Sequence, residues 1–133
     1  MSISGIRLAI KTALENIEGL HVFDVAPEDV NQLPAAYILP RGGDFDTTFG
    51  GSIAHRFEII VLVARGTDIG AAQKRLDQYL EDGDPHSVKT AVDVANLGAH
   101  GDTIRITGYR DYSAMEYSGA PCLGVKFDCE VVT

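Results

Sequence analysis

The sequence lacks a long apolar run. The longest uninterrupted one covers residues 59–64, far short of the roughly 20 residues that a membrane-spanning helix requires. The N-terminal segment, MSISGIRLAIKTALENIEG, carries scattered charges and no small-residue cleavage pattern after an apolar block. We therefore expect it to form a helix of the mature protein and not a signal peptide, and we expect no membrane partner.

Positive charge is scarce. The chain has 11 Lys and Arg residues against 19 Asp and Glu residues, which gives a formal net charge of −8. A protein that grips nucleic acid by its phosphates needs a basic face, and the basic residues here are dispersed along the sequence. The composition thus disfavours nucleic-acid binding. It remains compatible with DNA that passes an acidic surface without sticking, because like charges repel.

Cysteine is also scarce, with Cys122 and Cys129 as the two examples. They lie seven residues apart in one predicted strand segment, so they point to opposite faces and cannot bridge each other. We predict two reduced, buried thiols, which suits a cytosolic origin.

The residue patterns of common catalytic and metal sites are missing. No histidine lies three or four residues from another or close to a cysteine, so a locally built zinc site is not expected. The glycines Gly66 and Gly70 follow a strand but lack the Walker spacing and its Lys-Ser or Lys-Thr, and no G-x-S-x-G elbow is present. We predict no catalytic residues, no cofactor and no metal, hence a structural or interaction protein rather than an enzyme. A small ligand-binding domain or enzyme that uses the Gly66–Gly70 turn is a less favoured alternative.

What the sequence does contain is organised around residues 54–83. Residues 54–64 alternate apolar side chains on both faces, which predicts a central strand covered on both sides. Thr67 is the predicted N-cap of the helix that follows, and Gly83 is its predicted end. The apolar face of that helix is predicted to consist of Ile69, Ala72, Leu76, Tyr79 and Leu80.

The remaining elements are predicted around this unit. Helices are expected over residues 2–18 and from about Pro85, or Ser87 as an alternative cap, to Gly98. Strands are expected over residues 35–39, stopped by Pro40, and over residues 102–109 and 123–132, with a weak one over 20–25. Residues 27–34 and 111–121 are predicted as a loop and as a turn or ragged strand ends. Residues 1–133 therefore form one α+β domain, a mixed and mostly antiparallel sheet with about three helices mainly on one face.

Two regions are candidate contact surfaces. Residues 41–53 form a glycine-bracketed segment that is either a long hairpin or an exposed arm that orders against a partner. The last strand presents alternating polar residues to water or to a neighbouring subunit. The candidate interface residues are Arg41, Asp44, Phe45, Asp46, Phe49, Lys126, Asp128 and Glu130.

An ordered set of segments carries a resemblance to a known family. The segments are LENIEGL (14–20), LPAAYILP (33–40), TTFGGS (47–52), RFEIIVLVARGTD (56–68), AAQKRLDQYLEDGDPHSVKTAV (71–92), IRITGYRDY (104–112) and CLGVKFDCEVV (122–132). In this order they are similar to the small tail terminator proteins of long-tailed phages with non-contractile tails, especially those of actinobacterial hosts. The resemblance covers nearly the whole chain, it rests on the set rather than on any single motif, and it includes no catalytic signature.

The resemblance implies a small α/β domain that assembles as a hexameric ring. Such a ring caps the head-proximal end of the tail tube, ends tube growth and presents a surface to the head connector. The implied partners are other copies of the chain, the major tail tube protein and the head–tail connector protein, while genome DNA passes through without specific binding. The implied location is the virion tail, after synthesis in the host bacterial cytoplasm. A head-closure or tail-completion protein is the alternative phage component.

Within this family, we expect the segment 41–53 to contact the tail tube or the adjacent subunit, with Phe45 and Phe49 as anchors. The alternative is that both rings fold back on their own domain. Six copies at −8 each give a ring of −48, which would let DNA slide through an acidic lumen.

Overall fold

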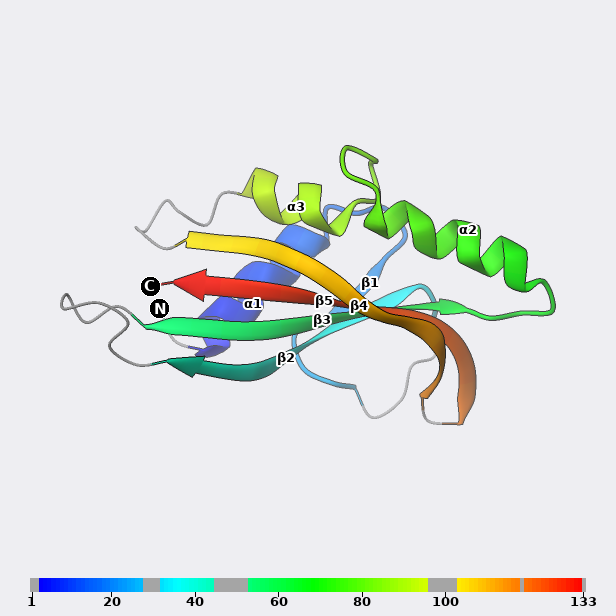
Figure 1. Cartoon of the computed structure of the whole chain (residues 1–133), viewed down its shortest axis with the longest axis horizontal. Helices are drawn as coiled ribbons and strands as arrows, with labels where there is room; N and C mark the ends of the chain where they lie inside the picture. The colour runs from blue at the N-terminus through cyan, green and yellow to red at the C-terminus, as the bar shows by residue number, and fades with distance from the viewer. Residues whose placement is uncertain (1–2, 28–31, 45–52, 96–102, 118, 133) are drawn as a thin grey trace.

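The computed structural model describes residues 3–27, 32–44, 53–95, 103–117 and 119–132. Its elements follow one another as α1 (Ile3–Leu14), β1 (His21–Phe23), β2 (Ala35–Asp44), β3 (Ala54–Ala64), α2 (Ile69–Leu80), α3 (Val88–Ala95), β4 (Thr103–Tyr117) and β5 (Ala120–Val132). Figure 1 shows one layer of strands with the helices beside it. The predicted α+β class is confirmed.

The five strands form one sheet in the order β1-β2-β3-β5-β4. The pairing of β1 with β2 is parallel, and the other three pairings are antiparallel. Strand β3 lies at the centre of the sheet between β2 and β5, as its two apolar faces predicted. The long, twisted hairpin of β4 and β5 curls at its tip, as Figure 1 shows.

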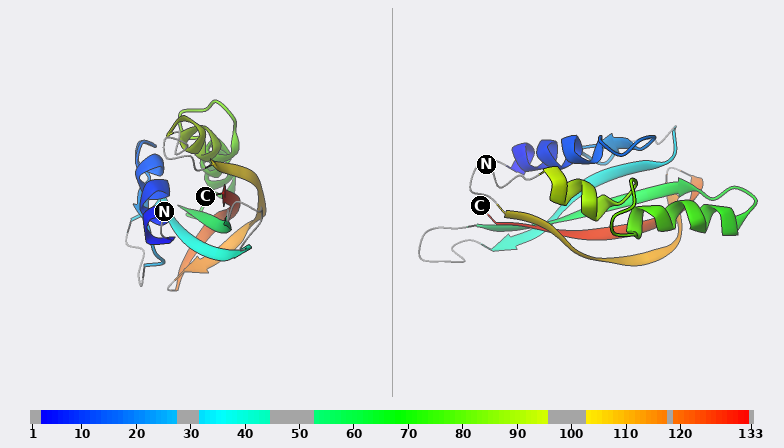
Figure 2. Two further views of the ribbon diagram at one scale, coloured as in Figure 1. Left: turned by 90° about the vertical axis from the view of Figure 1, so that its left-hand side faces the viewer. Right: turned by 90° about the horizontal axis from the view of Figure 1, so that it is seen from above.

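One large core joins the sheet to the helices. Figure 2 shows α1 along one side of the sheet, with α2 and α3 following one another beside β4. The core combines alternate residues of β3 and β5 with the apolar sides of the helices, because side chains alternate across a strand and recur every three to four residues on a helix. Its largest contributors include Ile6, Ile10, Leu14, Phe57, Ile59, Val61, Leu76, Val92, Val125 and Phe127.

The helix boundaries differ from the predictions at several points. Helix α1 ends at Leu14, four residues before the predicted end, although Ile17 in the following turn is still buried. Asp68 rather than Thr67 caps α2, since its carboxylate accepts a hydrogen bond of 3.1 Å from the amide of Ala71. The predicted core position Ile69 is wrong, because 47% of this residue is exposed.

The turn between α2 and α3 also refines the predictions. Helix α2 ends at Leu80, and Gly83 takes its left-handed conformation (φ +83°) in the turn beyond. Helix α3 begins at Val88, so Pro85 lies before the helix and not in its first turn. The alternative start, with Ser87 as the cap, is confirmed, because the Ser87 hydroxyl oxygen accepts a hydrogen bond of 3.2 Å from the Thr90 amide. The predicted end of this helix at Gly98 lies outside the described residues.

Strand β2 does not stop at Pro40. It continues to Asp44 through a bulge between Pro40 and Gly42. Among the described residues, β1 pairs with β2 only as far as Tyr37, so beyond this point β2 lies at the edge of the sheet, where proline is tolerated. Part of the predicted loop 41–53 is therefore strand, and residues 45–52 lie outside the described residues.

Of the two predictions for residues 111–121, the turn is wrong and the irregular strand ends are confirmed. Strand β4 runs for 15 residues to Tyr117, and β5 starts at Ala120. Register shifts between Ile106 and Gly108 and between Arg110 and Ser113 interrupt β4, and Asp111 has a φ of +58°. Each bulge inserts a residue and breaks the two-residue alternation from which a strand is recognised in sequence.

Candidate functional site

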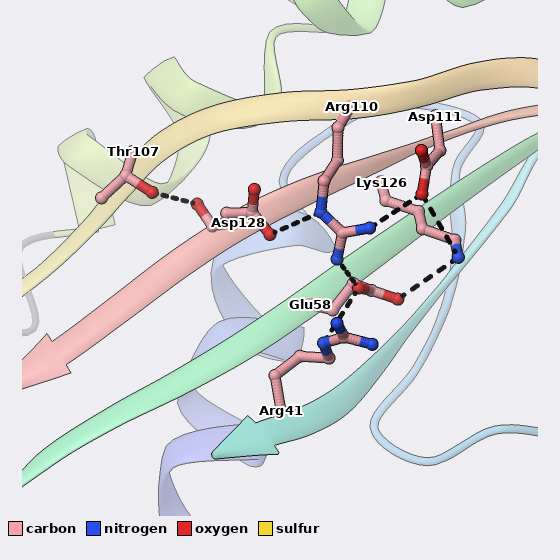
Figure 3. A network of polar contacts seen from close by, with 7 residues as sticks. All are labelled: Arg41, Glu58, Thr107, Arg110, Asp111, Lys126 and Asp128. Carbon is pink, nitrogen blue, oxygen red and sulfur yellow. Dashed lines mark hydrogen bonds and ion pairs between the residues drawn. The ribbon is translucent and has the colours of Figure 1, made fainter. Parts of the chain in front are cut away.

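The candidate site is the face of the sheet that the three helices leave uncovered, named here the helix-free face. Its central residues are Glu58, Ile60 and Leu62 of β3, which alternate with the residues of the large core. It has an apolar end and a charged end. The predicted polar residues of β5 lie at the charged end, where Figure 3 shows Lys126 and Asp128.

Side chains of the outer strands, together with Leu33 just before β2, cover the apolar end. Ile60, Leu62 and Cys122 are buried there, beneath partly buried side chains that include Tyr37, Met115 and Tyr117. The rings of Tyr37 on β2 and Tyr117 on β4 lie 5.4 Å apart between centroids, although two strands separate β2 from β4 in the sheet. The tip of the β4–β5 hairpin therefore curls over the face.

The charged end is built around Glu58. This residue is 2% exposed although no helix covers it. Its Oε2 atom accepts a hydrogen bond from Arg110 Nη2 and lies 3.4 Å from Arg41 Nε, while its Oε1 atom lies 3.9 Å from Lys126 Nζ. A buried carboxylate is costly unless it is paired, and here three cations from β2, β4 and β5 surround it (Figure 3).

A second ring of acidic groups balances these cations. Arg110 donates from Nε to Asp128 at 3.2 Å and from Nη1 to Asp111 at 2.8 Å, and Lys126 Nζ lies 3.6 Å from Asp111. With Arg41 and Glu58, the cluster holds three cations and three carboxylates. Its charges are fixed by mutual contacts across four strands, so the face presents a rigid polar pattern.

A hollow of about 390 Å³ opens at this charged end. Three arginines line it from adjacent parts of the sheet, together with the hydroxyl-bearing Thr107 and two acidic residues. The polar and charged residues that line the hollow are Arg41, Arg56, Arg110, Thr107, Asp128 and Glu130. Arg41 is the most accessible cation of the cluster, with 54% of its side chain exposed. Planar guanidinium groups in such a setting suit carboxylates or phosphates, which they bind through paired hydrogen bonds.

The two cysteine thiols are buried and are not reactive groups. Burial, aided by the nearby Glu130, raises the pKa of the Cys129 thiol to about 12, which keeps it protonated and unreactive at neutral pH. Burial also raises the pKa of Cys122. The two cysteines are free and lie on opposite faces of the sheet, as predicted. Over the part of the chain that the structure describes, no three His, Cys, Asp or Glu side chains are grouped so as to hold a metal ion.

The structure brings four of the eight predicted interface residues together. Arg41, Lys126, Asp128 and Glu130 lie at the charged end of the helix-free face. Asp44 ends β2, but its side chain lies outside the described part of the chain, as do residues 45–52 with Phe45, Asp46 and Phe49. The proposed aromatic anchors therefore remain a prediction.

Sequence reasoning missed Glu58, Arg56 and Arg110. A signal for Glu58 was present, because a carboxylate inside a strand that is apolar on both faces must be buried and hence needs a cationic partner. Nothing comparable marked Arg110, which lies beside the bulge between Arg110 and Ser113.

Comparison with protein-family models finds no match, and comparison with curated proteins finds none either. Among the described residues, no helix is long and apolar enough to cross a membrane.

Proposed function

We propose that this chain is a structural subunit of a phage tail. Copies of it assemble as a ring that caps the head-proximal end of the tail tube, ends tube growth and forms the surface to which the head connector attaches. The ordered sequence segments that resemble tail terminator proteins support this role. The α+β architecture, with one mixed sheet and its helices on one face, is compatible with that family.

The helix-free face supports a role in assembly with other protein chains. It combines the fixed charge network around Glu58 with a hollow of about 390 Å³ lined by three arginines. Arginine is enriched at protein interfaces, and a pre-arranged polar surface reduces the entropy lost on association. The same groups offer no nucleophile paired with a base, so a binding role suits them better than catalysis.

The proposed partners are other copies of the chain, the major tail tube protein and the head–tail connector protein. DNA passes through the ring without specific binding, which suits a chain of net charge −8. The role places the protein at the head-proximal end of the virion tail, after its synthesis in the bacterial cytoplasm.

Electron microscopy of phage lysates tests the proposal. The gene is interrupted by a stop codon, and the control is the same phage supplied with the intact gene from a plasmid. Overlong tail tubes without heads, beside separate heads, are the expected result. Tails of normal length detached from their heads would point instead to a joining protein of the head–tail connector. Normal infectious particles would contradict both roles.

A further inference from the structure

A turn rich in carboxylates lies on the opposite layer of the molecule from the arginine-lined hollow. Residues 77–84, which end α2 and begin the turn to α3, contain four carboxylates, and no Lys or Arg occurs between Arg75 and Lys89. Glu81 and Asp82 are exposed, and Asp82 shows 74% of its side chain to solvent. This segment is named here the acidic turn.

The outermost carboxylates of the acidic turn are weakly engaged. The Glu81 carboxylate makes no hydrogen bond or ion pair with any residue that the structure describes. Asp82 accepts a bond of 3.3 Å from the Thr90 hydroxyl and lies 3.9 Å from Lys89 Nζ, which pairs more closely with Asp93 at 2.9 Å. Both carboxylates can therefore accept hydrogen bonds from a partner at little cost.

The hollow offers donors of the matching kind. Among the described residues, Arg41 makes its contact to Glu58 through Nε, which leaves its two terminal Nη groups available at a half-exposed side chain. The guanidinium of Arg56 lines the same hollow and lies over Gly42, since a Cβ atom at that glycine would be 3.7 Å from Arg56 Nη2. Two guanidinium groups on adjacent strands therefore edge the hollow.

One molecule cannot join these two surfaces to each other. The acidic turn connects helices that pack on the large core (Figure 2), whereas the hollow opens on the helix-free face. A contact between them links two different surfaces of two copies. Such head-to-tail contacts generate a closed ring when the rotation between copies closes, and a filament when it does not.

We propose that the arginine-lined hollow of one copy receives Glu81 and Asp82 of the acidic turn of the next copy. This inference rests on the proposed ring, and it names the surfaces by which neighbouring copies recognise each other. The carboxylates hydrogen-bond with Arg41 and Arg56, while the Glu58 network below keeps the floor of the hollow rigid.

Charge exchange between the two surfaces tests the inference. The full chain is prepared with Arg41→Gln and Arg56→Glu (the hollow variant) or with Glu81→Lys and Asp82→Lys (the turn variant). Mass photometry at about 0.05 M salt, where surface charges are little screened, measures self-association of the chain alone and on purified tail tubes. Each variant alone should lose ring formation, because like charges then meet at the contact. An equimolar mixture should restore it, since every contact in an alternating ring again joins opposite charges.

Matched controls separate this effect from general changes in charge. Glu15→Lys with Glu18→Lys alters the net charge as the turn variant does, at exposed positions just after α1, and should leave ring formation unchanged. Circular dichroism confirms that each variant is folded. If Arg41→Gln lowers stability because it removes a partner of Glu58, Arg56→Glu alone serves as the hollow variant, provided that it stays folded without the contacts that Arg56 itself makes within the chain.

Three results would overturn the inference. Rings formed by both variants would exclude this contact while leaving the proposed function intact. A hollow variant that self-associates normally but no longer binds tubes would assign the hollow to the tube. A wild-type chain that forms rings neither alone nor on tubes would contradict the inference and the proposed function together.

Discussion

The two faces of β3 are both buried, but by different means. One face packs into the large core beneath three helices. On the other face, Ile60 and Leu62 are covered by the curled tip of the β4–β5 hairpin, and Glu58 is covered by its own cationic partners. A strand that is apolar on both faces therefore need not have helices on both sides.

The sharpest test of this difference substitutes two neighbours in β3. Ile59 faces the large core and Ile60 the small cluster, and both are almost fully buried. We expect Ile59→Ala to lower the free energy of unfolding by about 4 kcal/mol and Ile60→Ala by about 2 kcal/mol. The loss at Ile60 is smaller because the hairpin tip can move into the cavity that the substitution leaves there. Urea denaturation measures both. Equal losses would contradict the distinction between the two faces.

The next largest effect is expected at Glu58. Glu58→Gln keeps the volume of the side chain but leaves three cations facing each other without their common carboxylate. We expect a loss of about 2 kcal/mol in the free energy of unfolding. The matched control is Glu116→Gln at an exposed position of β4, which should change stability by less than about 0.5 kcal/mol. A loss at Glu58 as small as that of the control would show that the network does not stabilise the face.

Gly124 tests how closely the hairpin tip packs on the helix-free face. A Cβ atom at this position would lie 2.7 Å from Met115 Sδ and 2.8 Å from Leu62 Cδ2. We expect Gly124→Ala to cost about 1–2 kcal/mol, because the two side-chain ends can move but the backbone oxygen of Val61, at 3.2 Å from the same Cβ position, cannot. Gly108→Ala is the control, since a Cβ there meets nothing within 4 Å. Thermal unfolding of both variants should show a loss at Gly124 alone.

The smallest effect concerns the link between the edge of the sheet and the helices. Tyr112 on β4 donates a hydrogen bond of 2.8 Å to Asp77 on α2, and burial together with this bond raises the pKa of Tyr112 to about 12. The folded state therefore holds this proton more tightly than the unfolded state, whose pKa is about 10. The contribution to stability is complete below about pH 10 and is lost as the pH rises towards 12.

Tyr112→Phe should remove this contribution at neutral pH, at a cost of about 1 kcal/mol. The difference in stability between wild type and variant should then shrink as the pH rises from about 10 to 12. Burial also raises the pKa values of Tyr37 and Tyr79, but both proteins contain these residues. Their contributions to the pH dependence of stability therefore cancel in the difference between wild type and variant. A difference that stays constant over this range would contradict the role of the Tyr112 proton.

Most core residues of the helix-covered face could be predicted from sequence, although the exposed Ile69 is an exception. Alternation in β3 and β5 and the spacing of Ala72, Leu76 and Tyr79 in α2 identified core residues that the structure confirms. These signals are local, because each depends on the period of one regular element.

The helix-free face could be predicted only in part. Alternation placed Lys126, Asp128 and Glu130 on one side of the last strand, but Arg110 joins them through a strand that two bulges interrupt. Pro40 predicts a stop, because the sequence does not show that β1 ends before this part of β2 and leaves it at the edge of the sheet. The contacts around Glu58 depend on pairing between strands far apart in the chain, which a local pattern does not encode.

A cryo-electron microscopy structure of the chain assembled at the end of a tail tube tests the central claim most directly. The account predicts a ring in which the helix-free face, with Arg41 and the Glu58 network, contacts the neighbouring copy and is shielded from solvent. A ring in which this face is open to water, with copies joined through other surfaces, would contradict it.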